Sequence, residues 1–413
     1  MKSEMGTAKL SYGSAYQLTL KHISPLSTEW VGLSSLNGRV LVDELRAQVA
    51  SPSADVSLKD GYAIQSEDIR QAAPQNPVAL LLTGSVAAGG VYPGEVKPGT
   101  AVRILSGAPL PPGAQAVVAE EFTHLEGERV VVTANAHPGR NVLSKGSDFH
   151  KQERIAATGA VLQPAQIGLI AAAGFTKVQV YRRPQVAIIA TGDEVVAPGN
   201  KLQDGKLFAS NLVTLAAWCT HYGMQVITQV VKDDPEAIRQ SLEAAFRRQD
   251  AVLTSGGAWS GDRDLVVRVL EELGWREVYH RVKIGPGKAV GFGLLEDKPV
   301  FCLPGGPPSN YMAFLNLALP GLMKLAGWEQ PGLPTLDAQL STAVSGRIDW
   351  TQFVQGNFER REGRLYFHPL QMTSRLKMMA QAQGLITIPE GREHIAAGEI
   401  VAAQVLFWPN EGG

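Results

Sequence analysis

The hydrophobic and polar positions of residues 183–328 alternate between two periods. Short apolar runs, typical of strands buried on both faces, occur in QVAIIATGDE (185–194), MQVITQVV (224–231), DAVLTSGG (250–257) and PVFCLPGG (299–306). Segments with a helical period lie between or after them, at 210–223, 234–249, 262–274 and 308–327. The second of these helices starts with a favourable N-cap, Asp234, followed by Pro235. This alternation predicts a three-layer α/β domain with a mostly parallel sheet.

Residues 49–148 follow a different pattern. Short apolar runs such as VALLLTG and TAVRILSG are separated there by PG, PPG and GG, which predicts a β-rich domain with tight turns. Helices are expected at 14–23 and 164–174, and β structure again beyond residue 329. We therefore expect four domains: an α/β domain (1–28 and 182–328), a linking domain (29–48 and 149–181), the β-rich domain (49–148) and a C-terminal β domain (329–413).

Composition limits the class of protein. A chain of 413 residues, 45% hydrophobic and 19% charged, can form two to four globular domains. Its formal net charge of -1 provides no basic footprint for nucleic acid, so an anionic ligand must be held locally. Neither Cys219 nor Cys302 belongs to a CxxC motif, which argues against a zinc site or a disulfide framework. Because we find no signal-peptide pattern and no run of eighteen apolar residues, we expect a cytoplasmic protein without a membrane span.

Three strands of the predicted α/β domain run into loops of unusual composition: TGDE (191–194), TSGG (254–257) and LPGGPPS (303–309). The carboxyl ends of parallel strands lie at one edge of a sheet, where ligands bind in open α/β folds. We therefore expect the three loops to converge on one ligand site.

The segment TSGGAWSGDRD (254–264) combines bare backbone with a predicted helix start, an arrangement that favours phosphate or another oxyanion. Asp262 and Asp264 follow directly, and their negative charge would repel such an anion. A bound cation or a chemical step would explain why both features occur together. Either aspartate also fits a simple helix cap. Asp193 and Glu194, in the TGDE loop, are either functional or part of a solvated loop.

Other candidates have an ordinary structural explanation beside the functional one. Lys288, on a PGK turn, can meet a phosphate or oxyanion as a point charge, but it also fits a surface lysine. Ser309 either contacts a ligand or serves as an N-cap. Asp60, in DGYA, and Asp148, in KGSDF, fit structural turns. The sequence contains no Ser/His/Asp arrangement, no regular histidine ligand spacing and no Walker A loop.

Nine short motifs occur in a fixed order along nearly the whole chain. They are DGYA (60–63), RILSGAPLPPGAQAVVAEE (103–121), N-V-x-x-x-G-x-D (141–148), ATGDEVVAPG (190–199), SN (210–211), DDPEAIR (233–239), TSGGAWSGDRD (254–264), PGK (286–288) and LPGGPPS (303–309). One of these alone is weak evidence. Together and in this order, they resemble the motifs of the MoeA/gephyrin-E family of molybdopterin molybdenumtransferases.

The resemblance implies an activity and an architecture. Such proteins bind adenylylated molybdopterin, accept molybdate, cleave the adenylate and release molybdenum cofactor and AMP, with a divalent cation such as Mg²⁺ involved. The implied fold is an elongated α/β plus β chain with a MoaB/MogA-like three-layer α/β domain, a β-rich insert domain and a C-terminal β-barrel-like domain. The family usually forms homodimers, with the site between the α/β domain of one subunit and β-rich residues of the other. A molybdoenzyme or another cofactor-biosynthesis protein is the expected protein partner.

Matched position by position, the resemblance also implies site residues. Asp262 and Asp264 would be catalytic and would hold the metal, and Lys288 and Glu194 would be catalytic as well. Candidate molybdate contacts are Lys288, Ser309, Thr373 and Ser374. The implied substrate-binding residues are Thr254, Ser255, Gly256, Gly257, Asp60, Ser106, Asp148, Gly305, Gly306, Ser309, Thr373 and Ser374.

The chain departs from the family pattern at basic positions. A lysine before PGK is Gly285 here, and two arginines of the C-terminal domain are Trp350 and Gln355. Two lost charge-assisted contacts would weaken molybdate binding by on the order of a hundredfold unless nearby basic residues replace them. The basic residues nearby are Lys283, Arg281 and Arg347. This motivates a second hypothesis, a carrier or chaperone that binds the pterin without insertase chemistry. A third, another phosphoanhydride hydrolase on the same α/β domain, would not need the flanking β domains.

Overall fold

The computed structural model describes residues 10–256, 265–371 and 374–407. Two compact units make up the chain. Unit 1 comprises Met1–Glu29, Gly38–Val40 and Val180–Gly413, and unit 2 comprises Trp30–Asn37 and Leu41–Gln179. Within the described residues, none of the helices combines the length and the apolar character that crossing a bilayer requires.

Unit 1 contains a six-stranded sheet with the strand order β16-β13-β17-β21-β20-β18. The first four strands are parallel, which confirms the mostly parallel sheet. The last two, β20 and β18, join one edge through antiparallel pairings, β20 with β21 and β18 with β20, and the apolar pattern does not predict them. The bounds are β13 (Gln185–Thr191), β16 (Gln225–Val231), β17 (Ala251–Ser255), β18 (Arg276–His280), β20 (Gly291–Leu295) and β21 (Lys298–Leu303).

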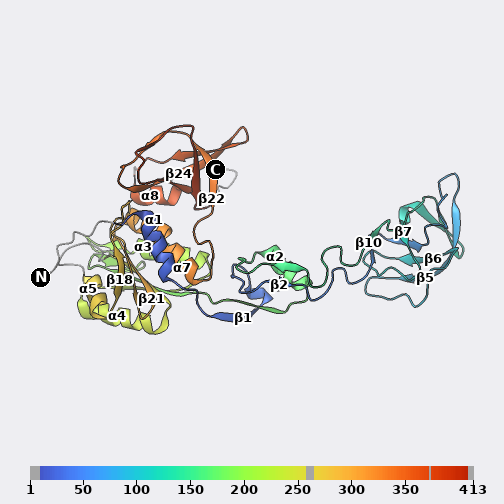
Figure 1. Cartoon of the computed structure of the whole chain (residues 1–413), viewed down its shortest axis with the longest axis horizontal. Helices are drawn as coiled ribbons and strands as arrows, with labels where there is room; N and C mark the ends of the chain where they lie inside the picture. The colour runs from blue at the N-terminus through green and yellow to red at the C-terminus, as the bar shows by residue number, and fades with distance from the viewer. Residues whose placement is uncertain (1–9, 257–264, 372–373, 408–413) are drawn as a thin grey trace. The chain divides into compact units, whose positions relative to one another are not determined.

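Helices cover both faces of this sheet, as the sequence predicts (Figure 1). The alternation along β13 shows the physical reason, because successive side chains of a strand point to opposite faces. Ile188 packs in a core with residues of α1, α3, α6 and α7, whereas Ile189 packs in a separate core with α4 and α5. The helices are α1 (Tyr12–His22), α3 (Ser210–His221), α4 (Pro235–Arg248), α5 (Leu265–Glu272), α6 (Pro307–Ala313) and α7 (Leu319–Leu325), with a π-helical segment, Phe314–Ala318, joining the last two.

The N-caps of α4 and α6 can be compared with those predicted from the sequence, Asp234 and Ser309. In α4, the Asp234 carboxylate accepts a hydrogen bond from Ala237 N at 2.8 Å, and the predicted N-cap is confirmed. In α6, the N-cap is Gly306. Ser309 lies in the first turn of that helix, so an N-cap role for Ser309 is wrong. Two consecutive prolines, which need no hydrogen-bond partner for a backbone N–H, set the helix start earlier than the serine suggests.

The C-terminal part of unit 1 is a closed barrel in which β24, β25, β22, β28 and β26 pair in a ring. Phe358, Phe367 and Ile386 belong to its core. The short strand β19 (Ile284–Gly285) pairs in parallel with the start of β24, which ties the following PGK turn to the barrel. The bounds are β22 (Thr335–Leu340), β23 (Val344–Ser345), β24 (Thr351–Arg361), β25 (Arg364–Pro369), α8 (Arg375–Gln381), β26 (Gly384–Ile388), β27 (His394–Ile395) and β28 (Ile400–Val405).

Unit 2 contains a six-stranded sheet of order β7-β4-β6-β5-β9-β8, in which only the β5–β6 pair is parallel. Gly61 begins β4 directly against β7, since a Cβ at this position would lie 1.9 Å from Val118 O. The glycine of DGYA is therefore required for strand pairing. The strands are β3 (Val56–Ser57), β4 (Gly61–Ile64), β5 (Val78–Val86), β6 (Thr100–Ile104), β7 (Ala116–Ala119), β8 (Thr123–Glu126), β9 (Arg129–Val132) and β10 (Val142–Leu143).

The segments that flank this sheet in the sequence are short strands and one helix. They are β1 (Thr28–Gly32), β2 (Leu45–Arg46), β11 (Arg154–Ala156), α2 (Pro164–Ala172) and β12 (Lys177–Tyr181). The helix confirms the element expected at 164–174, with Pro164 in its first turn. A capping box between Gln163 and Gln166 fixes its start.

Candidate functional site

A pocket of about 820 Å³ lies at the carboxyl ends of β13, β17 and β21 in unit 1. The three loops predicted to converge contribute to it together, through Thr191, Ser255 and Gly305 among others. The start of α3 and the two short parallel strands β14 (Val195–Val196) and β15 (Leu207–Phe208) complete this side. The pocket is lined by Ala190, Thr191, Gly192, Glu194, Val195, Leu207, Phe208, Ala209, Ser210, Asn211, Leu212, Asp233, Ser255, Gly256, Gly305, Gly306, Pro307, Arg375 and Leu376.

Two glycines let the strand-end loops approach each other. Gly256 has a φ of +102°, and a Cβ there would lie 2.5 Å from Thr191 O. A Cβ on Gly305 would lie 3.6 Å from the Cα of Gly256, so the second and third loops are in van der Waals range. Because no side chain covers this backbone, a ligand can come close to it.

Ser255 has both of its acceptor positions occupied by amide groups. Asn310 Nδ2 donates to Ser255 Oγ at 3.0 Å and to Pro304 O at 2.9 Å. Asn211 Nδ2 donates to Ser255 Oγ at 3.3 Å and to Gly305 O at 2.8 Å. The backbone carbonyls fix the orientation of both amides, because only an N–H can donate to them. A hydroxyl has two acceptor sites and one hydrogen, so the Ser255 hydrogen remains to donate to a ligand in the pocket.

Besides the Ser255 hydroxyl, the pocket contains two carboxylates. Glu194 and Asp233 line it, and Asp233 N donates to Asp193 Oδ1 at 3.4 Å. Burial raises the pKa of Asp233, and repulsion from Asp193 and Glu194 raises it further. Lys206 Nζ donates to the backbone carbonyl of Asp193 at 2.6 Å, which holds the TGDE loop. This acidic wall is suited to a cation or to a proton-transfer step.

The other predicted residues of the three loops lie in different environments. Thr254 is fully buried inside β17 and does not line the pocket. Its Oγ1 has no hydrogen-bond partner among the described residues. Ser309 lies half-buried in the first turn of α6. A Cβ on Gly287 of the PGK turn would lie 3.2 Å from Ser309 O, so this turn packs directly against the start of α6, and the exposed Lys288 follows it.

The C-terminal barrel brings one helix to the pocket. Ser374 is the N-cap of α8, and its hydroxyl accepts from Lys377 N at 3.5 Å. The next two residues, Arg375 and Leu376, line the pocket. Ser374 itself is not among the lining residues, so the cap positions its neighbours.

The basic residues near the altered family positions are already engaged. Lys283 Nζ pairs with Glu390 Oε1 at 2.8 Å. The Arg347 guanidinium lies 5.0 Å from the centre of the Trp350 ring and its Nε lies 3.7 Å from Asp349 Oδ1. Gln355 is 6% exposed, and its Nε2 lacks a hydrogen-bond partner within the described chain. This buried amide without a partner is a polar group in the barrel wall.

Three predicted residues belong to unit 2. Asp60 Oδ1 accepts from Ser106 N at 2.7 Å, so the sequence motifs DGYA and RILSG meet. Asp148 Oδ2 accepts from Ser51 Oγ at 3.0 Å. Both carboxylates thus join segments that are distant in the sequence, 46 and 97 positions apart, rather than closing a local turn.

Four predicted site residues lie outside the described residues. They are Asp262, Asp264, Gly257 and Thr373. Within the ranges that the structure covers, no group of three or more His, Cys, Asp or Glu side chains is placed to hold a metal ion.

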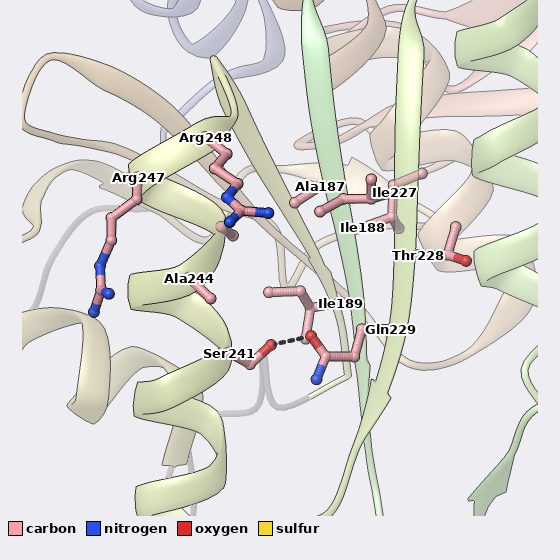
Figure 2. Close-up of a pocket in the computed structure, with 11 residues that line it drawn as sticks. Ala187, Ile188, Ile189, Ile227, Thr228, Gln229, Ser241, Ala244, Arg247 and Arg248 are labelled. Atoms are coloured by element: carbon pink, nitrogen blue, oxygen red, sulfur yellow. Dashed lines mark hydrogen bonds between the residues drawn. The ribbon is translucent and has the colours of Figure 1, made fainter.

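A smaller pocket of about 340 Å³ lies between α4 and the strands β13 and β16 (Figure 2). Its polar contact is a hydrogen bond of 2.8 Å from Ser241 Oγ to Gln229 Oε1. Arg247, at its rim, pairs with Glu243 at 3.3 Å. None of the predicted site residues lines this pocket, and its walls offer no carboxylate for acid–base chemistry.

Sequence reasoning missed four residues in or directly beside the larger pocket. Asn211 and Asp233 belong to the quoted motifs SN and DDPEAIR, and their polarity next to a strand end was the available signal. Asn310, which holds Ser255 from behind, directly follows LPGGPPS. Arg375 comes from a distant segment, and no local pattern marks it.

Comparisons with known proteins agree along the whole chain. Family models of the MoeA N-terminal region (domain I and II), the probable molybdopterin binding domain and the MoeA C-terminal region (domain IV) match residues 10–174, 187–324 and 337–406. The molybdopterin molybdenumtransferase 2 of Mycobacterium tuberculosis is 32% identical over 384 residues, which cover 92% of this chain and 94% of that protein. The molybdopterin molybdenumtransferase of Nostoc sp. is 31% identical over 397 residues, covering 94% and 90%.

A solved structure shows the same architecture. The molybdopterin biosynthesis MoeA protein from Pyrococcus horikoshii superposes with a TM-score of 0.80 at 31% sequence identity, covering 96% of this chain and 99% of that chain. This chain thus has the same multidomain architecture, with sheet-rich regions, an α/β domain and a closed C-terminal barrel. The chain belongs to the MoeA family.

Proposed function

We propose that this protein acts in molybdenum cofactor biosynthesis as a molybdopterin molybdenumtransferase. It inserts molybdenum from molybdate into adenylylated molybdopterin and releases molybdenum cofactor and AMP. The names of the relatives support the reaction class. The observation that carries the proposal is the single pocket in which the ends of β13, β17 and β21 bring together bare backbone, the Ser255 hydroxyl and two carboxylates.

The glycine loops hold the phosphate end of the substrate. Gly256, Gly305 and Gly306 place no side chain at the strand ends, with Gly256 N itself donating to Leu303 O at 3.1 Å, and Ser255 keeps its hydroxyl hydrogen for a ligand in the same space. The Ser255 hydroxyl, which Asn310 and Asn211 already hold, does not need to reorganise when the ligand arrives, so it stabilises an oxyanion effectively.

Glu194 and Asp233 would hold Mg²⁺ in the same pocket. Mg²⁺ is usually bound through one or two carboxylates together with substrate phosphates and water, and these two side chains meet that requirement. Burial raises the pKa of Asp233 most and repulsion from Asp193 and Glu194 raises it further; a cation would relieve the repulsion. When bound, the metal supplies positive charge to the phosphoanhydride. Asp262 and Asp264 remain the metal ligands and catalytic residues expected from the sequence.

The rim of the pocket is suited to a flat ring system. Leu207, Phe208 and Leu376 line the pocket and are 52%, 39% and 51% exposed. Apolar side chains that line a pocket can pack against the face of a ligand ring. A substrate that joins a charged phosphate to a heterocycle therefore matches both ends of the pocket.

The remaining expectations from the resemblance are part of the same proposal. Lys288, Ser309, Thr373 and Ser374 are proposed molybdate contacts, and Asp60, Ser106 and Asp148 are proposed substrate contacts. We also propose a cytoplasmic homodimer that passes the cofactor to a molybdoenzyme or a cofactor-biosynthesis partner.

One observation favours a second candidate function, a carrier that binds molybdopterin without inserting metal. Gly285 and Gln355 stand where the family has basic residues, and Lys283 is paired with Glu390. The experiment that separates the two is AMP release from adenylylated molybdopterin with and without molybdate. Molybdate-dependent release supports the transferase, and tight binding without release supports the carrier.

A further inference from the structure

Arg375 supplies a positive charge to a pocket whose other charged lining residues are negative. The charged residues of the lining are Glu194, Asp233 and Arg375, two carboxylates and one guanidinium. A ligand that carries phosphate charge meets repulsion from the first two. The guanidinium is the group of this lining that can offset the repulsion directly.

The guanidinium of Arg375 is available for a ligand. The side chain is exposed, and it forms no ion pair or hydrogen bond with a residue in the described ranges. Two other basic side chains have partners: Lys206 donates to the carbonyl of Asp193, and Lys283 pairs with Glu390. An arginine that lines a pocket without an internal partner keeps all five of its N–H donors for the ligand.

The backbone of Arg375 is fixed although its side chain is exposed. It is the first residue of α8, directly after the N-cap Ser374. Met378 N donates to Ser374 O at 3.0 Å, which closes the first turn. The adjacent Leu376 lines the same pocket, so the first turn of α8 forms one of its walls. This wall comes from the C-terminal barrel domain, whereas the glycine loops come from the α/β sheet.

From this placement we infer that Arg375 binds the phosphate group of the adenylylated substrate and so makes the C-terminal domain part of the substrate-binding pocket. The inference rests on the proposed function for the identity of the substrate. It adds a contact that selects phosphorylated over unphosphorylated ligands. It also assigns the α8 segment a binding role that does not depend on the missing lysine and arginine positions.

The test compares the affinities of AMP and adenosine, measured by calorimetry on the full chain. Arg375→Gln weakens AMP binding by roughly tenfold to a hundredfold, the effect of losing one charge-assisted contact. Arg375→Lys retains part of the affinity, because lysine keeps the charge but not the bidentate fork. Adenosine binding is unchanged in both variants. The matched control is Lys377→Gln, which removes an exposed charge from the same helix outside the pocket lining and changes AMP affinity by less than about twofold.

Equal AMP affinities for Arg375→Gln and Lys377→Gln would overturn the inference. Thermal unfolding of each variant checks folding, and Arg375→Lys keeps the test valid if the glutamine variant does not fold. Measurements of AMP release distinguish a failure of the Arg375 inference from a failure of the proposed function. Release that is normal in Arg375→Gln overturns this inference alone, whereas absent release with Arg375-dependent binding of AMP overturns the proposed function alone. A wild-type protein that binds neither AMP nor inorganic pyrophosphate overturns both.

Discussion

Asn310 Nδ2 donates to Ser255 Oγ at 3.0 Å across 55 positions of the sequence. The same nitrogen donates to Pro304 O at 2.9 Å, so one buried amide joins the start of α6, the end of β17 and the loop after β21. The functional consequence is that the Ser255 hydroxyl, which already accepts from two amides, keeps its hydrogen for a further acceptor. The geometry of the site therefore depends on a residue that does not itself line the pocket.

Removal of this amide should affect both stability and binding. Asn310→Ala leaves Pro304 O without its partner and leaves Ser255 with Asn211 alone, and we expect it to lower the free energy of unfolding by about 2 kcal/mol or more. We also expect weaker AMP binding, measured by calorimetry. Asn316→Ala is the matched control, because Asn316 is equally buried but donates to Met312 O within its own helical segment. It should destabilise the fold and leave AMP affinity unchanged; equal losses of affinity in the two variants would refute the positioning role of Asn310.

The Ser255 hydroxyl should contribute to binding of an anionic ligand. Ser255→Ala removes one hydrogen bond to a charged group, and we expect a loss of about tenfold in AMP affinity and in turnover. Ser345→Ala, at an exposed position on β23, provides the control with the same chemical change. If Ser255→Ala binds AMP like the control, the hydroxyl does not point to the ligand.

Gly256 should not tolerate a side chain. Its φ is +102°, and an added Cβ would lie only 2.5 Å from Thr191 O, so we expect Gly256→Ala to cost about 2 kcal/mol or more of stability. Gly306→Ala is the stability control, since its φ is −68° and a Cβ there meets nothing within 4 Å. Chemical unfolding of both variants checks this, and a Gly256→Ala protein as stable as Gly306→Ala would show that the loop backbone differs.

The acidic wall should make stability depend on pH. Because the pKa of Asp233 is raised in the folded state, its charged form opposes folding, and this cost is absent when the group is protonated. Asp233→Asn should therefore stabilise the protein at pH 7; its advantage should fade as the pH falls through the raised folded-state pKa, and it should be absent below about 4, where the unfolded group is also protonated. Unfolding midpoints across pH 3–8 test this, with Asp204→Asn as a control for an exposed carboxylate outside the pocket. A stabilisation by Asp233→Asn that increases toward low pH would contradict the raised pKa of Asp233.

Asp233→Asn should have opposite effects on stability and on Mg²⁺-dependent AMP release. If Glu194 and Asp233 hold Mg²⁺, Asp233→Asn raises the Mg²⁺ concentration needed for half-maximal AMP release while increasing stability at pH 7. Titration of Mg²⁺ against AMP release measures this. An unchanged Mg²⁺ requirement would remove Asp233 from the metal site.

The sequence predicts the part of the site that depends on local rules. Apolar runs that end in Gly-rich loops place Ser255 and Gly305 at one sheet edge, because parallel strands share their direction. Thr254 shows where this reasoning ends: its neighbour Ser255 faces the pocket, whereas Thr254 points into the core, and a strand alternates its side chains between faces. The motif alone does not say which of the two residues faces outward.

Contacts between distant segments could not be predicted in the same way. Arg375 lies 120 positions after Ser255, and only the closed barrel and its α8 segment bring it to the pocket. Likewise, the pairing of Lys283 with Glu390 depends on the parallel contact of β19 with β24. Such juxtapositions follow from tertiary packing, which leaves no local period in the sequence.

The most direct test of the proposed activity is AMP release from adenylylated molybdopterin by the purified full chain in the presence of Mg²⁺. We expect release that requires molybdate and that falls by about tenfold in Ser255→Ala. Release that is equal with and without molybdate, or substrate binding with no release under either condition, would contradict the proposed activity.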